Sequence, residues 1–495
     1  MVANRGEIAV RVQQTLKTLG ITTVAVYSDP DATAPHVLMA DEAWPLGGQS
    51  AAETYLDMER IITIAHRSGA EAIHPGYGFL SENPQFARTC TEAGIVFIGP
   101  SPESMEALGD KISSKELALQ AGAPVVPNSS PCDRVDDAVD RFVATWGFPL
   151  LVKAAAGGGG RGMRLVNSVE GLAPALESAG REAQAAFGDG RVFLERYIPR
   201  PRHVEIQVLA DGSGNTLHLL ERDCSIQRRY QKIIEETPSP VLTPELRRRM
   251  GEAAVAVTRS AGYVNAGTVE FLVDSESGEF YFLEMNTRLQ VEHPITEEIL
   301  GLDLVEWQVR IAFGEELTLK QDDIQARGHA VECRIYAEDP YNDFAPSVGT
   351  LERWLPPNGP GLRLDSGVAQ GQTIPTYYDP MLAKLIAWGP DRESSLHRME
   401  LALSQFPVLG VVTNIQFLRQ VIRHPQFMEG DYDTGFLSGN LELSQPESPG
   451  ESLDLAQALA AWAMDQAPSQ QPRIQAGPAT AQNNPWRTAG KLRLP

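Results

Sequence analysis

The first hundred residues alternate short apolar runs with amphipathic segments, and this alternation constrains the fold more than any other feature. Apolar runs occupy 22–27, 72–74 and 95–100, and 52–67 has the periodicity of a helix. Strands that alternate with helices usually pair in parallel, because each helix carries the chain back across the sheet. We therefore predict an α/β fold with an N-terminal doubly wound parallel sheet. A helical pattern begins almost at Met1, so we expect a very short first strand.

The rest of the chain predicts further units of mixed α+β structure. A helix that ends at Gly122-Ala123-Pro124 marks one boundary, and a run rich in Pro, Ser, Gln and Ala after about residue 440 marks another. A short docking helix is expected at 453–464. The predicted domains are 1–112, 113–314 with a smaller subdomain at about 125–197, 327–440, and a linker with the start of a further domain at 441–495.

Composition limits the class of partner. The 495 residues carry a formal charge of −22, which opposes binding to nucleic acids and to anionic membranes. No apolar run approaches the ~20 residues of a membrane span, and we expect a cytoplasmic protein. The four cysteines form no metal-binding or disulfide-scaffold spacing, so buried reduced thiols are expected.

A predicted β-hairpin carries two glutamates that face each other. Strands at 268–273 and 280–286 flank a polar turn centred near Ser277, and symmetric pairing about that turn sets Glu270 opposite Glu284. Asn286 shares their face, since strand side chains alternate. Like charges directly opposite each other are destabilising unless a cation or a shared proton compensates. Oxygen ligands of this kind suit Mg²⁺, although an exposed face with two solvated glutamates is the alternative.

Two other segments are suggestive but weaker. After a strand at 149–153, four consecutive glycines at 157–160 predict a mobile loop that can close over phosphates, with Lys153 as a nearby charge. The alternative for the glycines is a plain flexible turn. The segment 221–232 is dense in charged side chains, and its alternative is a solvated surface loop.

These features combine into a resemblance that covers residues 1 to about 440. The chain resembles the biotin carboxylase family of the ATP-grasp superfamily, and 284–293 is the most specific of its motifs. The resemblance implies an ATP-grasp domain with a mobile glycine-rich lid and a C-terminal mixed α+β biotin carboxylase domain. The segments that carry the resemblance are 76–83, the glycine loop, 202–205, 227–229 and 284–293.

The resemblance also implies roles for particular residues. ATP ligands are expected at Lys111, Lys153, Gly159, Gly160, Glu195, Tyr197, Ile198, His203 and Tyr230. Ligands of Mg²⁺ or Mn²⁺ are expected at Glu270, Glu284 and Asn286. The bicarbonate pocket is expected at Lys232, Arg288, Glu292 and, through its backbone, Val291, and Arg334 is expected to meet biotin. Tyr230 stands where the family usually has histidine, which puts one nucleotide contact in doubt.

The implied activity is ATP-dependent carboxylation of biotin by bicarbonate through carboxyphosphate. The forms of 335–340 and 378–385 resemble the α subunits of acyl-CoA carboxylases. No Ala-Met-Lys-Met biotinylation site occurs, so we expect biotin on another domain or chain, a carboxyltransferase β subunit as partner, and a homo-oligomer. The alternatives are another ATP-grasp ligase, such as a carbamoyl-phosphate or purine-pathway enzyme, and a non-catalytic homologue that scaffolds a carboxyltransferase.

Overall fold

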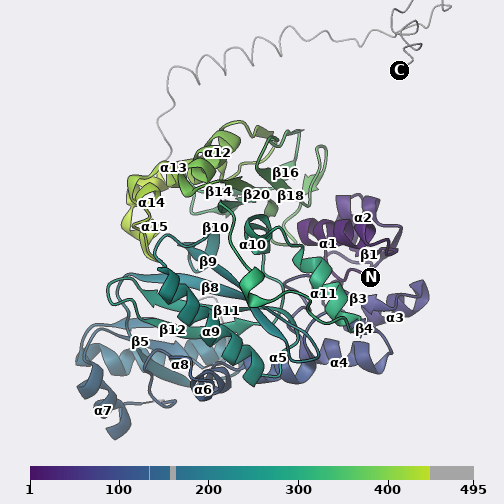
Figure 1. Cartoon of the computed structure of the whole chain (residues 1–495). Helices are drawn as coiled ribbons and strands as arrows, with labels where there is room; N and C mark the ends of the chain where they lie inside the picture. The colour runs from purple at the N-terminus through teal and green to yellow at the C-terminus, as the bar shows by residue number, and fades with distance from the viewer. Residues whose placement is uncertain (133, 156–162, 446–495) are drawn as a thin grey trace, which may run out of the picture. The chain divides into compact units, whose positions relative to one another are not determined.

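The N-terminal module is a parallel sheet covered by helices, as predicted (Figure 1). The computed structural model describes residues 1–132, 134–155 and 163–445. Val2 forms parallel bridges to Ala25 and to His74 and so joins two strand pairs, which is the whole of the predicted short first strand. The pairs are β1 (Val24–Tyr27) with β2 (Glu42–Pro45), and β3 (Ala72–Ile73) with β4 (Val96–Phe97).

Helices of this module follow the predicted pattern with shifted ends. The helix predicted at 52–67 begins only at Met58, because the Asp57 side chain accepts the Arg60 N–H at 3.0 Å and caps it. The helices are α1 (Gly6–Thr18), α2 (Pro35–Met39), α3 (Met58–Ser68), α4 (Pro84–Glu92) and α5 (Pro102–Gly109).

A smaller antiparallel sheet lies within the subdomain predicted at 125–197. Its strand order is β6-β5-β7, and the apolar faces of its strands pack with two helices into a separate core cluster. The predicted strand 149–153 corresponds to β5. Helix α6 (Lys111–Gln120) precedes the subdomain. The elements of the subdomain are α7 (Asp137–Trp146), β5 (Leu150–Ala154), β6 (Arg164–Val166), α8 (Val169–Phe187) and β7 (Val192–Arg196).

An antiparallel sheet of eight strands, in the order β12-β11-β8-β9-β10-β13-β20-β18, forms the centre of the described chain. It crosses the predicted boundary between 113–314 and 327–440, because β10 pairs directly with β13. The strands are β8 (Pro201–Ala210), β9 (Thr216–Arg228), β10 (Gln231–Thr237), β11 (Asn265–Asp274), β12 (Phe280–Asn286), β13 (His329–Tyr336), β18 (Leu362–Ser366) and β20 (Met381–Gly389).

Helices and short strand pairs complete this part. In Figure 1, α9 lies against the strands of the large sheet and α12 beside β20. The helices are α9 (Pro244–Ser260), α10 (His293–Leu300), α11 (Leu304–Ala312), α12 (Arg392–Ser404), α13 (Ile415–Arg423), α14 (Pro425–Glu429) and α15 (Phe436–Gly439). The short pairs are β14 (Glu338–Asp339) with β15 (Ala345–Pro346), β16 (Gly349–Thr350) with β19 (Thr373–Ile374), and β17 (Arg353–Trp354) with β21 (Val408–Leu409).

Two predictions about the sheet have clear outcomes. The hairpin pairs Glu270 with Glu284 as predicted. The next pair is Phe271 with Phe282, so Leu283 has no partner across the ladder and forms a β-bulge. The charged segment 221–232 is not a solvated loop, since most of it belongs to β9, where Arg222 is fully buried.

The predicted helix at 453–464 lies outside the described residues. Among the helices that the structure describes, none is long and apolar enough to cross a membrane.

Candidate active site

One cavity of about 760 Å³ brings the predicted site residues together. Gly159 and Gly160 lie outside the described residues. All the other predicted site residues line this cavity: Lys111, Lys153, Glu195, Tyr197, Ile198, His203, Tyr230, Lys232, Glu270, Glu284, Asn286, Arg288, Val291, Glu292 and Arg334. They come from sequence positions more than two hundred residues apart, and the large sheet is what unites them.

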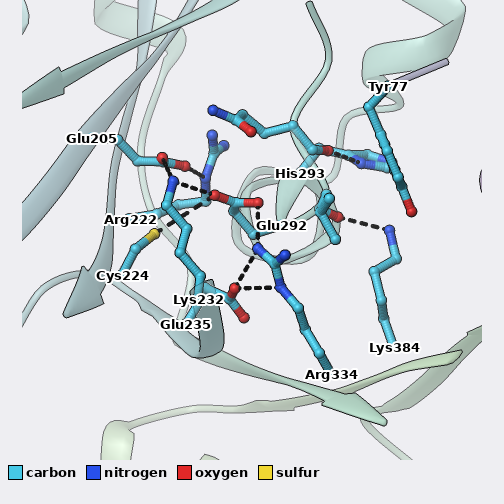
Figure 2. Close-up of polar contacts among 12 residues, drawn as sticks. Tyr77, Glu205, Arg222, Cys224, Lys232, Glu235, Glu292, His293, Arg334 and Lys384 are labelled. Carbon is cyan, nitrogen blue, oxygen red and sulfur yellow. Dashed lines mark hydrogen bonds and ion pairs between the residues drawn. The ribbon is translucent and has the colours of Figure 1, made fainter. Parts of the chain in front are cut away.

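Lys232 lies at the centre of a buried ionic cluster (Figure 2). Its Nζ donates to Glu205 Oε2 at 2.5 Å, to Glu270 Oε1 at 2.8 Å and to Glu292 Oε1 at 2.7 Å. Burial lowers the pKa of Lys232, but the three carboxylates outweigh burial and raise it well above its ordinary value. The ammonium group is therefore permanently charged, and each of its three protons has an acceptor.

Glu292 is fully buried between two cations. Its Oε2 accepts from an Arg334 guanidinium nitrogen at 2.9 Å, while Oε1 accepts from Lys232. Burial raises the pKa of Glu292, but Lys232 and Arg334 outweigh burial and hold that pKa well below its ordinary range. Glu292 also immediately precedes α10, whose N-terminal end favours negative charge. The carboxylate is therefore ionised, which is the form that accepts a proton.

Arg288 contacts the N-terminal module rather than Glu292 directly. Its Nε donates to Glu82 Oε2 at 3.0 Å, and a terminal nitrogen donates to Gln290 Oε1 at 2.7 Å. The Thr287 N–H also donates to Glu82, at 3.2 Å. Glu82 thus fixes the backbone at Thr287 and Arg288, while the direct hydrogen-bond partners of Glu292 are Lys232 and Arg334.

Oxygen-bearing side chains, those of Glu270, Glu284 and Asn286, gather on one face of the hairpin. Asn286 donates to Glu270 Oε1 at 2.9 Å, and Glu284, opposite Glu270, has a side chain that is 40% exposed to the cavity region. His203 Nε2 lies 2.8 Å from Glu270 Oε2. Burial raises the pKa of Glu270, but Lys232 and His203 outweigh burial and lower it, so the group is ionised. These oxygen ligands fit a hard divalent cation.

Three further lysines line the same cavity, at Lys111, Lys115 and Lys153. Lys153 and Lys115 both pair with Glu195, whose carboxylate is almost fully buried, and Lys115 Nζ lies 2.5 Å from it. Lys111 Nζ lies 3.8 Å from Glu284. The side chain of Glu195 therefore positions two lysines, while the neighbouring Tyr197 and Ile198 line the cavity wall.

Tyr230 occupies a strained turn at the cavity. The hairpin between β9 and β10 turns through Arg229 and Tyr230, with φ angles of 48° and 69°. Such a turn normally takes Asn or Gly, because other side chains are disfavoured in the left-handed region. Tyr230 is 60% exposed and lines the cavity. The strained backbone of the turn therefore holds a tyrosine at the cavity, where a bound ligand can contact it.

The sequence analysis missed several residues that contact the predicted site residues. Arg222 donates to Glu205 at 2.5 Å and also to Gln207 and Thr268, and so braces the carboxylate that binds Lys232. The alternation of β8 offered a signal for Glu205, which shares a strand face with His203. The other missed residues are Glu82, Lys115, Glu235 and Lys384.

Comparison with known proteins agrees with this geometry. Residues 1–105 match the family model for the biotin carboxylase N-terminal domain, and 332–439 match that for the C-terminal domain. Between them, 110–320 match the ATP-binding domain of the carbamoyl-phosphate synthase L chain.

Relatives extend over most or all of the chain. The chain is 47% identical over 496 residues to the mitochondrial methylcrotonoyl-CoA carboxylase subunit alpha of Dictyostelium discoideum, covering all of this chain and 70% of that protein. It is 50% identical to the biotin carboxylase of Nostoc sp., covering 88% of this chain and 98% of that one.

A solved structure has the same fold. The biotin carboxylase domain dimer of Hydrogenobacter thermophilus 2-oxoglutarate carboxylase, in complex with MgADP, ADP and bicarbonate, is similar with a TM-score of 0.86 and 49% identity. That match covers 90% of this chain and 98% of the other. With its fold, its cavity and its relatives in agreement, the chain belongs to the biotin carboxylase family.

Proposed function

We propose that this protein carboxylates biotin on a carrier, using ATP and bicarbonate, as the first half-reaction of an acyl-CoA carboxylase. One observation carries the proposal: the buried contact of Glu292 with both Lys232 and Arg334 lies in the same cavity as the oxygen ligands of the hairpin. A base flanked by cations suits an anionic substrate, and the hairpin ligands suit a metal nucleotide.

In the first step, Glu292 takes the proton of bicarbonate as bicarbonate attacks the γ-phosphate of ATP. Glu292 is ionised before substrate arrives, since Lys232 and Arg334 lower its pKa. Bicarbonate is also an anion, so it competes with Glu292 for these cations. When Lys232 and Arg334 interact with bicarbonate, they stabilise the Glu292 carboxylate less. The pKa of Glu292 then rises, which makes it a better base during the attack. Lys232, Arg288 and the Val291 backbone hold bicarbonate, and the products are ADP and carboxyphosphate.

The nucleotide lies along the lysines that line the cavity. Lys111 and Lys153 neutralise phosphate charge, and His203, Tyr197, Ile198 and Tyr230 contact the rest of the nucleotide. Glu270, Glu284 and Asn286 would hold Mg²⁺ or Mn²⁺, which supplies positive charge to the phosphoryl oxygens. The glycine run 157–160 lies outside the described residues, so its closure as a lid that excludes water stays a prediction.

In the second step, carboxyphosphate breaks down to CO₂ and phosphate, and the phosphate removes the ureido proton of biotin. The deprotonated ring nitrogen then attacks CO₂. Arg334 stabilises the negative charge that develops on the ureido oxygen, because its guanidinium lines the cavity and is permanently charged. Burial lowers the pKa of Arg334, but Glu235 and Glu292 raise it.

The acyl-CoA class rests on a relative whose match covers the whole chain, a methylcrotonoyl-CoA carboxylase α subunit. Partners of this proposal are a biotin carboxyl carrier, a carboxyltransferase β subunit and a second copy of the chain. The predicted domain boundaries stay predictions. The cytoplasmic location also stays a prediction, since the relatives include proteins named mitochondrial. The buried catalytic cluster argues against a scaffold, which needs none of these side chains.

Release of ADP tests the proposal. Purified protein with MgATP should release ADP only when bicarbonate is present, and free biotin should increase the rate. ADP release that ignores bicarbonate would favour another ATP-grasp ligase. Nucleotide binding without any turnover would favour the scaffold.

A further inference from the structure

Two buried glutamates lie behind Arg334 and have no part in the proposed reaction. Glu235 of β10 and Glu332 of β13 are register partners on adjacent antiparallel strands. Both are 0% exposed. Register partners point to the same face of a sheet, with Cβ atoms about 5 Å apart. The two carboxyl groups therefore face the same small volume inside the protein.

These carboxyl groups have too few hydrogen-bond donors for two full charges. Glu235 Oε1 accepts from Arg334 Nε at 2.7 Å. Among the residues that the structure describes, none donates a hydrogen bond to Glu235 Oε2 or to either carboxyl oxygen of Glu332. A buried carboxylate without donors is strongly destabilised, and like charges opposite each other add to that cost. A shared proton removes one charge and supplies one missing donor.

Charged groups from every adjoining element act on the pair. Burial raises the pKa of Glu235 to about 7, with Arg334 opposing and Glu292 adding to the rise. Burial also raises the pKa of Glu332 well above its ordinary value, with Lys384 opposing. The titratable groups that interact with the pair are Cys224 of β9, Lys232 of β10, Cys333, Arg334 and Tyr336 of β13, Lys384 of β20, and Glu292, which immediately precedes α10.

We propose that Glu235 and Glu332 share one proton and act as a singly charged brace for Arg334. This inference deepens the proposed function and rests on it. One negative charge is enough to hold the guanidinium through Nε and keep it pointed at the cavity. A second charge, beside the ionised Glu292, would repel bicarbonate and carboxyphosphate. Loss of the shared proton at higher pH therefore weakens bicarbonate binding, and both glutamates are positioning residues.

The pH dependence of the KM for bicarbonate tests the brace. In the wild type this KM should rise at least about threefold from about pH 7 to about pH 9, while the KM for ATP stays constant. Glu332→Gln cannot gain the second charge, so its KM should stay flat. Glu59→Gln, which removes an exposed carboxylate, should follow the wild type. A parallel rise in Glu332→Gln would overturn the proposal.

Infrared spectroscopy of the ligand-free protein tests the shared proton without turnover. A carboxylic acid carbonyl band at neutral pH should be weaker in Glu332→Gln and unchanged in Glu59→Gln. Glu332→Met removes the same proton with an apolar side chain and serves if the glutamine variant does not fold. A band of equal strength in wild type and both Glu332 variants would refute the brace. Absence of bicarbonate-dependent ADP release would instead refute the proposed function.

Discussion

Lys384 on β20 donates to the main-chain carbonyl of Val291 at 2.7 Å, across 93 positions of sequence (Figure 2). Its Nζ also lies 3.2 Å from Glu7 Oε1, and the Lys384 side chain is fully buried. One cation thus ties the start of the chain and a strand of the C-terminal region to the residue that immediately precedes Glu292.

Lys384→Met should weaken bicarbonate binding and destabilise the protein. The Val291 carbonyl loses its donor, so the backbone beside Glu292 can shift, and Glu7 loses its buried partner. Removing one partner of a buried pair costs about 3–5 kcal/mol. We expect a raised KM for bicarbonate with little change in the KM for ATP, and a lower free energy of unfolding in urea.

Lys17→Met is the matched control for Lys384→Met. Lys17 pairs with Asp41 at 2.9 Å, but both side chains are exposed, so its loss should change neither KM nor stability. Equal KM values for bicarbonate in Lys384→Met and wild type would show that the Val291 contact does not position the site.

Glu284→Gln should raise the Mg²⁺ concentration needed for half-maximal ADP release by about tenfold or more. An amide keeps the shape of the side chain but loses the charge that attracts a hard cation. Glu279→Gln removes an exposed carboxylate from the same hairpin and should leave the requirement unchanged. If the two variants respond alike to Mg²⁺, the hairpin is not the metal site.

Arg288→Ala should lower turnover by about 10²–10³ if its guanidinium stabilises charge in the transition state. The variant also frees Glu82, so thermal unfolding should be measured beside the kinetics. Arg248→Ala removes an exposed arginine of α9 and provides the comparison. Wild-type turnover in Arg288→Ala would remove that residue from the catalytic group.

Glu292→Gln should abolish bicarbonate-dependent ADP release, because an amide cannot accept the proton of bicarbonate. Nucleotide binding should persist, since the predicted ATP ligands are unchanged, and this can be measured by fluorescence titration with an ATP analogue. Retained bicarbonate-dependent turnover would show that another group is the base.

Stability should fall as the pH drops below about 6.5, partly because of His74. Burial lowers the pKa of His74 to about 4. Its Nδ1 accepts from the Gly76 N–H at 3.0 Å, and Nε2 pairs with Gln308 at 3.2 Å, so the neutral ring fits the fold. The unfolded chain binds the proton more readily, so stability is full above the unfolded pKa and declines between about pH 6.5 and pH 4.

The pH dependence of urea unfolding measures this contribution. His74 accounts for roughly 2–3 kcal/mol of the decline at its lower end. His74→Gln cannot bind the proton and should show a shallower decline, whereas His66→Gln, on an exposed position of α3, should match the wild type. Identical slopes for wild type and His74→Gln would contradict this assignment.

Local features of the fold were predictable from sequence, and long-range ones were not. The facing of Glu270 and Glu284 followed from a short turn, which fixes register by symmetry. The bulge next to that pair was missed, because one extra residue leaves no compositional mark. The pairing of β10 with β13, and with it the Glu235–Glu332 pair, joins segments almost a hundred residues apart. No local periodicity reports such a partner.

The candidate site was predictable largely through resemblance, residue by residue. Hydrogen-bond partners were not predictable: nothing in the sequence indicated that the Glu195 carboxylate pairs with Lys115 and Lys153. The many charged residues around Arg222 allowed a surface loop as an interpretation, but Arg222 is buried and pairs with Glu205. The sequence alone does not reveal such a buried partner.

Transfer of labelled carbon from bicarbonate to biotin tests the central claim most directly. The protein, incubated with MgATP, biotin and ¹⁴C-bicarbonate, should form acid-labile labelled carboxybiotin in proportion to the ADP released, and Glu292→Gln should form none. ADP release without labelled biotin, or labelling that persists in Glu292→Gln, would contradict the account.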